Sequence, residues 1–293
     1  MSDFSVDLVR ASGRSMSIGD GFSGGSLIML QNPQGLGMPP QDLSLSPVLA
    51  GHGSVLRGAR STERDIRLPV FVDTNDFHDF HAVLGELQQI LNPFDPDELT
   101  VRVSRSGGDG WREIPVRYAG GLEDHTEAYY RTSGKIGIEL KAPGALWRGE
   151  PVQVTRQVAP VRKPFLSLTQ PFFPVVLAPS TVAGRLSVEI RGDAPTFPMW
   201  TVTPPGEDLL IRNLVTGARL FLSGTISEQI IVDMAAGRVY SAATGANLND
   251  RLSLDSRFFE LTPGLQELEF SMVGATTASM LDLKYAPRYL SGY

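Results

Sequence analysis

The sequence predicts a mainly β protein with two domains, the first of which carries one α-helix. Three observations lead to this fold class. Alternating apolar and polar residues, the pattern of half-buried strands, recur along most of the chain. Only residues 73–92 have apolar side chains at helical spacing. A proline-rich stretch at 149–183 separates the strands around this helix from a second series of strands with no helical period.

The length and composition are those of a folded protein with more than one core. A chain of 293 residues with 42% hydrophobic and 20% charged residues is typical of two domains. The formal net charge of −6 disfavours nucleic-acid binding through a broad basic surface. The absence of cysteine excludes disulfides and thiolate chemistry. No secretory signal pattern and no apolar run of about 18 residues is present, so we expect cytoplasmic synthesis and no membrane insertion.

We expect the first 60 residues to form an irregular arm at the start of a first domain that covers residues 1–148. Gly, Ser, Pro and Met are frequent there, and only residues 25–31 (GSLIMLQ) have the pattern of a short strand. A long irregular stretch is unusual inside one compact domain. The arm is therefore expected to wrap a partner or a neighbouring subunit.

The rest of the first domain is predicted to be an antiparallel sheet covered by the helix. Residues 64–73 alternate cleanly, but Pro69 lacks an N–H group, which predicts an edge strand or a local break. Three further alternating runs, near residues 99–103, 114–118 and 136–140, complete the sheet.

The helix itself has clear end signals. Asp73 is the expected N-cap, and Pro93 disfavours helical geometry in the residue before it. The apolar stripe consists of Phe77, Phe80, Leu84, Leu87 and Leu91.

The second domain is predicted to be a β-sandwich or jelly roll at 184–293. The six prolines within residues 149–183 are typical of an extended connector. Beyond it, short alternating strands are separated by turn residues such as Pro204-Pro205-Gly206 and Pro263-Gly264.

The order and spacing of several local sequences resemble siphophage distal tail proteins. In the second half these are GDAPTFPMWTV (192–202), IRNLVTGARLFL (211–222), IIVD (230–233), FFELTPGLQELEF (258–270) and KYAPRY (284–289). In the first half they are RDIRLPVFVD (64–73), LNP (91–93), WREIPVRYAGGL (111–122) and KIGIELKAPGALW (135–147).

The resemblance implies a ring-forming N-terminal domain and a galectin-like C-terminal β-sandwich. It implies a non-enzymatic structural protein of the virion. Copies of this protein would form a hexameric ring at the tail tip that joins the tail tube to the host-adsorption apparatus and leaves a channel for DNA. The implied partners are further copies of the chain, the tail tube protein, the tape-measure protein and tail-tip hub or adhesion proteins. Assembly would take place in the host cytoplasm, without specific nucleic-acid binding. No catalytic, cofactor-binding or metal-binding residue is expected.

Two clusters of polar residues could instead carry a metal site or acid–base chemistry. His78 and His81 lie three residues apart on the predicted helix, where two imidazoles could share a metal ion, but no third ligand is evident. Glu123, Asp124, His125 and Glu127 could perform acid–base chemistry or bind a cation, although a hydrophilic hairpin tip has the same composition.

Two further features suggest binding rather than catalysis. Arg191-Gly192-Asp193 spells an adhesion tripeptide at a position where Gly and Asp are typical of a turn. Trp111, Trp147 and Trp200 could form a sugar platform or pack in the core.

Two alternatives to the tail-protein interpretation remain open. A carbohydrate-binding module acting through the C-terminal sandwich would bind glycans in isolation. A glycan-cleaving enzyme that uses Glu123 or Asp124 would turn over a cell-wall polysaccharide.

Overall fold

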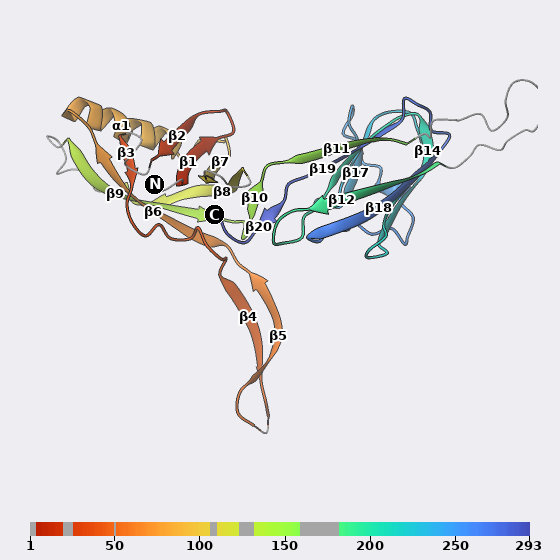
Figure 1. Cartoon of the computed structure of the whole chain (residues 1–293), viewed down its shortest axis with the longest axis horizontal. Helices are drawn as coiled ribbons and strands as arrows, with labels where there is room; N and C mark the ends of the chain where they lie inside the picture. The colour runs from red at the N-terminus through yellow and green to blue at the C-terminus, as the bar shows by residue number, and fades with distance from the viewer. Residues whose placement is uncertain (1–3, 20–25, 50, 106–109, 123–131, 159–181) are drawn as a thin grey trace, which may run out of the picture. The chain divides into compact units, whose positions relative to one another are not determined.

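A computed structural model describes residues 4–19, 26–49, 51–105, 110–122, 132–158 and 182–293 (Figure 1). The described chain consists mainly of antiparallel strands with one α-helix, which confirms the predicted fold class. It divides into two compact units. Unit 1 comprises Met1–Glu150 together with Arg288–Tyr293, and unit 2 comprises Pro151–Pro287. Unit 2 is therefore an insertion within unit 1 along the chain.

Unit 1 is organised around a nine-stranded sheet whose main path runs β2-β1-β7-β8-β9-β6-β3. β10 pairs with β8 and also with β20. The two ends of the main path meet as well, because Gly19 N donates to Leu27 O at 3.0 Å and Met29 N donates to Gly19 O at 2.7 Å. The strands are β1 (Phe4–Arg10), β2 (Ser15–Ile18), β3 (Leu27–Met29), β6 (Arg64–Asp73), β7 (Leu99–Arg105), β8 (Trp111–Gly120), β9 (Ser133–Ala142), β10 (Trp147–Gly149) and β20 (Arg288–Tyr289).

The helix α1 (Phe77–Ile90) covers the core of unit 1 with Phe80, Leu84, Leu87 and Ile90, all of which are buried. The expected cap at Asp73 is wrong. Asp73 is still the last residue of β6, where its N–H donates to Ser26 O, so the helix cannot begin there. Asp76 is the N-cap instead, and its Oδ1 accepts from Asp79 N at 2.9 Å.

Strand β6 is not an edge strand, contrary to the expectation from Pro69. It pairs with β9 along its whole length and with β3 at Val70–Val72. Pro69 is tolerated because the hydrogen bond at this position uses its carbonyl oxygen, which accepts from Leu30 N at 2.8 Å, so no N–H group of Pro69 is needed. The neighbouring strand β3 is only three residues long, which is too short to be recognised from alternation.

The first 60 residues are not an irregular arm. They contain β1, β2 and β3, which belong to the sheet, and two further strands, β4 (Gln41–Pro47) and β5 (Ser54–Ser61). β4 and β5 form a separate two-stranded hairpin that projects from the sheet of unit 1 (Figure 1). Only two buried apolar residues mark β1, Val6 and Leu8, and so short an alternation does not stand out in the sequence.

Unit 2 is a sandwich of a five-stranded sheet, β11-β19-β13-β16-β17, and a four-stranded sheet, β12-β18-β14-β15. Apolar side chains of both sheets share one core around Trp200. The strands are β11 (Val152–Gln157), β12 (Val182–Ile190), β13 (Met199–Thr203), β14 (Gly206–Asn213), β15 (Arg219–Ile226), β16 (Ile230–Asp233), β17 (Arg238–Ser241), β18 (Gly264–Val273) and β19 (Met280–Tyr285), with a 3-10 helix η2 (Asn249–Arg251).

The compact units differ in extent from the ranges 1–148 and 184–293 expected from the sequence. β11 lies at the start of the expected connector and pairs with β19 of the sandwich. The last six residues, Arg288–Tyr293, belong to unit 1. Residues 159–181 of the connector lie outside the described residues. That the two ranges fold as separate domains stays a prediction.

Candidate functional site: an exposed apolar hairpin

The β4–β5 hairpin has two faces of different chemistry. Leu43 and Leu45 lie two residues apart on β4 and therefore project from the same face. Their register partners are Ala59 and Leu56, so one face of the hairpin is apolar. A β-bulge between Ser44 and Leu45 keeps the leucines aligned across the two strands.

The opposite face is more polar, although it includes the apolar side chain of Val55. Asp42 faces Arg60, with Arg60 Nε at 3.0 Å from Asp42 Oδ2. Ser44 lies opposite Gly58, and Ser46 lies opposite Val55. The hairpin is therefore amphipathic, like a strand pair that packs one side on a core.

No core covers the apolar face within the described residues of this chain. Leu43, Leu45 and Leu56 are 52%, 57% and 56% exposed, and Leu49 at the tip is fully exposed. Full burial of one leucine side chain stabilises a protein or a complex by about 1.5–3 kcal/mol. A large part of this stabilisation is missing for each of the exposed leucines. An isolated two-stranded hairpin is at best marginally stable in water. Exposed apolar strips of this kind are typical of surfaces that bind another protein.

The sequence contains the signal for this hairpin, which the expectation of an irregular arm overlooks. Residues 41–47 alternate as QDLSLSP, and residues 54–61 (SVLRGARS) follow after a turn with Gly51 and Gly53. Gly53 has a φ of 98°, a conformation that favours glycine.

The two histidines of the helix lie on its exposed side. The His78 ring contacts Phe77 at a tilt of 34° with centroids 3.9 Å apart, and His81 contacts Phe80 edge-on at 6.0 Å. Among the described residues, no group of three or more His, Asp or Glu side chains is arranged to hold a metal ion. The cluster Glu123, Asp124, His125 and Glu127 lies outside the described residues.

The adhesion-like tripeptide follows the end of β12. Arg191 and Asp193 are exposed, and Gly192 has a φ of 108°. This backbone conformation requires glycine for structural reasons alone. The turn therefore accounts for the residue types at this position.

The tryptophans do not form an open sugar platform. Trp147 and Trp200 are fully buried, each in the core of its own unit. Trp111 is half-buried and lies under the guanidinium of Arg102, 4.2 Å from the ring centroid. Trp147 and Trp200 therefore present no face to a sugar, and Arg102 covers one face of Trp111.

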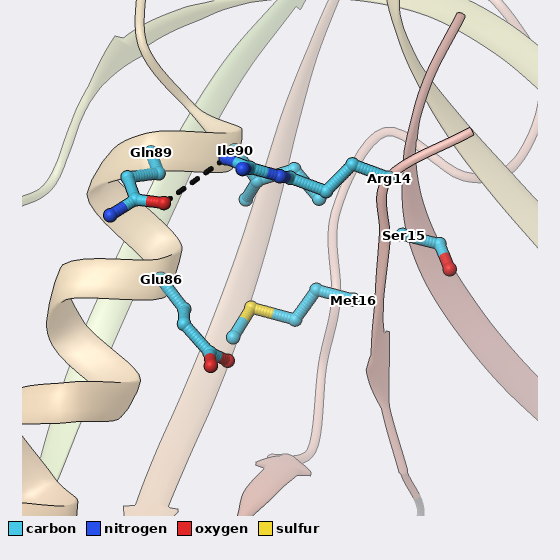
Figure 2. A pocket seen from close by; sticks show the side chains of 6 residues that line it. All are labelled: Arg14, Ser15, Met16, Glu86, Gln89 and Ile90. Atoms are coloured by element: carbon cyan, nitrogen blue, oxygen red, sulfur yellow. Dashed lines mark hydrogen bonds between the residues drawn. The ribbon is translucent and has the colours of Figure 1, made fainter. Parts of the chain in front are cut away.

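Two depressions in the surface of unit 1 are further candidate sites. The first, of about 250 Å³, lies between β2 and α1, and Figure 2 shows Arg14 reaching over it to Gln89. Arg14 Nη1 donates to Gln89 Oε1 at 3.1 Å, and Met16 and Glu86 also line the depression. A single carboxylate beside a methionine is not an acid–base pair.

The second depression, of about 580 Å³, is lined by Asp7, Glu98 and the Arg102–Glu113 pair, among others. Arg102 Nη2 lies 3.0 Å from Glu113 Oε2, and the two residues are register partners on β7 and β8. The carboxylate of Glu113 is thus occupied by a cross-strand ion pair. In this depression the charges connect neighbouring strands of the sheet rather than surround a substrate.

Comparison with known proteins shows what the two units are similar to. Residues 191–289 match the model of the siphovirus-type tail component, C-terminal domain. Unit 2 carries a siphovirus-type tail component domain. No curated protein sequence matches the chain. Of the helices in the described residues, none has the length and apolar character needed to cross a membrane.

Solved structures extend the similarity to the whole chain at the level of the fold. The crystal structure of the SPP1 Dit protein matches with a TM-score of 0.64 and 13% identity, covering 97% of this chain and 98% of that one. Chains of the phage P2 baseplate, in its activated conformation with Ca and with Sr, match with TM-scores of 0.52 and 0.51 and 9% identity. Each covers 96% of this chain and 97% of the baseplate chain.

These comparisons confirm the resemblance to siphophage distal tail proteins that the local sequences predict. The matched domain and the similar folds support a structural role in a phage tail or baseplate. The exposed hairpin can now be interpreted in that setting.

Proposed function

We propose that this protein assembles into a closed homo-oligomeric ring at the tail tip and acts there without enzymatic activity. The ring joins the tail tube to the host-adsorption apparatus and leaves a channel through which DNA passes. The SPP1 Dit protein is described as a paradigm of the hub adsorption apparatus in phages that infect Gram-positive bacteria, which supports the same role here. The number of six copies comes from the family resemblance alone.

The observation that carries the proposal is the apolar face of the β4–β5 hairpin. Leu43, Leu45 and Leu56 form a strip that projects from the sheet of unit 1. A neighbouring copy would cover this strip, and the polar face with the Asp42–Arg60 pair would remain in water. A surface of one copy that docks on a different surface of the next generates a ring when the rotation closes.

The charge of the chain is compatible with a channel for DNA. The formal net charge is −6, so a ring of such chains has no broad excess of basic residues to bind phosphates. DNA can then pass without being held. The partners of the ring would be the tail tube protein, the tape-measure protein and tail-tip hub or adhesion proteins, with assembly in the host cytoplasm.

The mass of the full-length protein in solution tests the proposal. At tens of micromolar we expect a closed oligomer, formed either by the protein alone or after addition of its tail tube neighbour. A variant with Leu43→Ser, Leu45→Ser and Leu56→Ser should remain monomeric. The matched control, Asp42→Ser with Arg60→Ser, changes the polar face and should assemble as the original protein does. A strict monomer under both conditions would overturn the proposal.

A further inference from the structure

We propose that the C-terminal segment Arg288–Tyr293 is a clasp that fixes the root of the β4–β5 hairpin, and that assembly through the hairpin requires this clasp to be docked. The root consists of residues 34–40, which lead into β4, and residues 61–64, which lead out of β5. The statement about assembly rests on the proposed function, whereas the statement about the root does not.

The centre of the clasp is the buried side chain of Arg64. Its guanidinium donates to Gly35 O at 2.8 Å and to Gly37 O at 2.7 Å. Both acceptors lie in the part of the root that leads into β4. The guanidinium also donates to Ala145 O at 3.1 Å, before β10, and to Leu290 O at 3.1 Å in the C-terminal segment. Arg64 is 1% exposed, and burial lowers the pKa of its guanidinium below the ordinary value. One buried cation thus joins the root to the C-terminal segment.

A second layer of contacts holds the C-terminal segment against the same root. Gly292 N donates to Leu36 O at 2.7 Å. A Cβ atom on Gly292 would lie 3.0 Å from Cζ2 of Trp147, so the glycine backbone lies directly on the indole ring. Trp147 is fully buried, and the Arg64 guanidinium lies 5.7 Å from its ring centroid. The indole is therefore covered by the residue that the clasp contributes.

Apart from the side chain of Leu36, which is buried in the core of unit 1, few contacts of its own fix the root. Gln34 and Arg67 exchange two backbone hydrogen bonds, and Thr62 N donates to Pro40 O at 3.0 Å. Between these two points, residues 35–37 are held by Arg64 and the C-terminal segment. Gly35 has a φ of 80° and lies so close to β6 that a Cβ atom would be 2.1 Å from Asp65 O. Loss of the clasp would leave buried donors and acceptors unpaired at this point.

The clasp also has a defined place in the chain. It begins at Arg288, directly after unit 2, and β20 pairs with β10 so that Trp147 faces Tyr289 and Arg148 faces Arg288. The segment that leaves unit 2 is therefore the same segment that closes on the hairpin root. The end of unit 2 is therefore continuous in the chain with the segment that holds the root of the hairpin, the element that we propose for self-association.

Two full-chain variants test the inference. In Gly292→Val the branched side chain cannot fit against the buried indole of Trp147, so the segment should be displaced. A chain ending at Tyr289 removes residues 290–293 without adding bulk. The control is Gly137→Val on β9, because Gly137 is exposed and no atom lies within 4 Å of a Cβ atom added there. Hydrogen exchange of the amide at position 292, which donates to Leu36 O in the docked segment, reports displacement in the substituted chain. Exchange is also measured for the amides of Gln34 and Thr62 at the root and of β7 in the core.

With the clasp displaced, we expect at least tenfold faster exchange at the root, unchanged exchange in β7 and at least tenfold weaker self-association. Unchanged exchange at the root despite a displaced segment would overturn the inference. So would equal loss of protection in β7 for both variants, because the segment would then belong to the general core. If the original protein is a monomer, the proposed function fails, while exchange at the root still decides the clasp.

Discussion

Arg10 caps the C-terminal end of α1, where its Nε donates to the carbonyl oxygen of Ile90 at 2.8 Å. Its Nη2 donates to Asn92 O at 2.7 Å, just beyond the helix. The last carbonyl groups of a helix have no partner within the helix, and a cation there also meets the negative end of the helix dipole. A residue at the end of β1 thus completes a helix some 80 positions further along the chain.

We therefore expect Arg10→Met to destabilise unit 1 by about 3 kcal/mol, because the buried carbonyl groups lose their donors. Chemical denaturation of the full chain, followed by the fluorescence of unit 1, measures the effect. Arg14→Met is the matched control. Arg14 is exposed and donates only to Gln89, so a change below about 0.5 kcal/mol is expected. Equal effects of the two substitutions would contradict the capping role.

The stripe of α1 provides a second test. Leu87 is fully buried, so Leu87→Asp places an unpaired carboxylate in the core and should cost several kcal/mol. His78→Ala, on the exposed side of the same helix, should change stability little. Thermal unfolding of unit 1 checks both substitutions. An unchanged midpoint for Leu87→Asp would show that the helix is not packed as described.

The helix and most strands could be predicted from the sequence because their periodicity is local. Phe80, Leu84 and Leu87 recur at steps of three and four, and this pattern needs no knowledge of partners. The N-cap was placed wrongly because the N–H of Asp73 is engaged by Ser26, a long-range contact. Local pattern alone cannot reveal which backbone groups the sheet already uses.

The candidate site was harder to predict for a different physical reason. The leucines of the hairpin alternate with polar residues like those of any half-buried strand. However, none of the described residues of this chain buries them. The position of Arg64 in the sequence is one signal of a buried cation that the pattern analysis of β6 can detect. It lies in phase with the buried positions Ile66 and Leu68 on β6, which marks it as an inward-facing cation. Its carbonyl partners, as distant as Leu290, are not visible from the sequence.

A buried amide pair in unit 2 supplies a third prediction. Asn213 Nδ2 donates to Gln266 Oε1 at 3.1 Å, and Asn213 Oδ1 accepts from Val215 N at 2.8 Å in the turn after β14. Asn213 is fully buried, so Asn213→Leu leaves several polar groups unpaired and should cost about 2–4 kcal/mol. Val215→Ser, at an exposed position of the same turn, should be nearly neutral. Denaturant unfolding of both variants decides whether the pair carries this stability.

The extent of the sandwich gives the last prediction. A fragment of residues 184–293 lacks β11, whereas a fragment of residues 151–287 retains it. β11 pairs with β19 along six residues, and Val152 and Val154 pack on the core of unit 2. Without β11, strand β19 becomes an exposed edge and part of that core is uncovered. We expect the 151–287 fragment to unfold cooperatively and the 184–293 fragment to be less stable and prone to association.

Circular dichroism melting and light scattering of the two fragments measure the difference. The contribution of Val152 and Val154 can be isolated in the longer fragment with Val152→Ser and Val154→Ser. Gln153→Ser is the control, because this side chain is exposed on the same strand. If the shorter fragment were as stable as the longer one, β11 would be dispensable and the sandwich would begin at β12, as the sequence ranges suggest. If the two valine substitutions lower the melting temperature and the control does not, the core of the sandwich begins at β11.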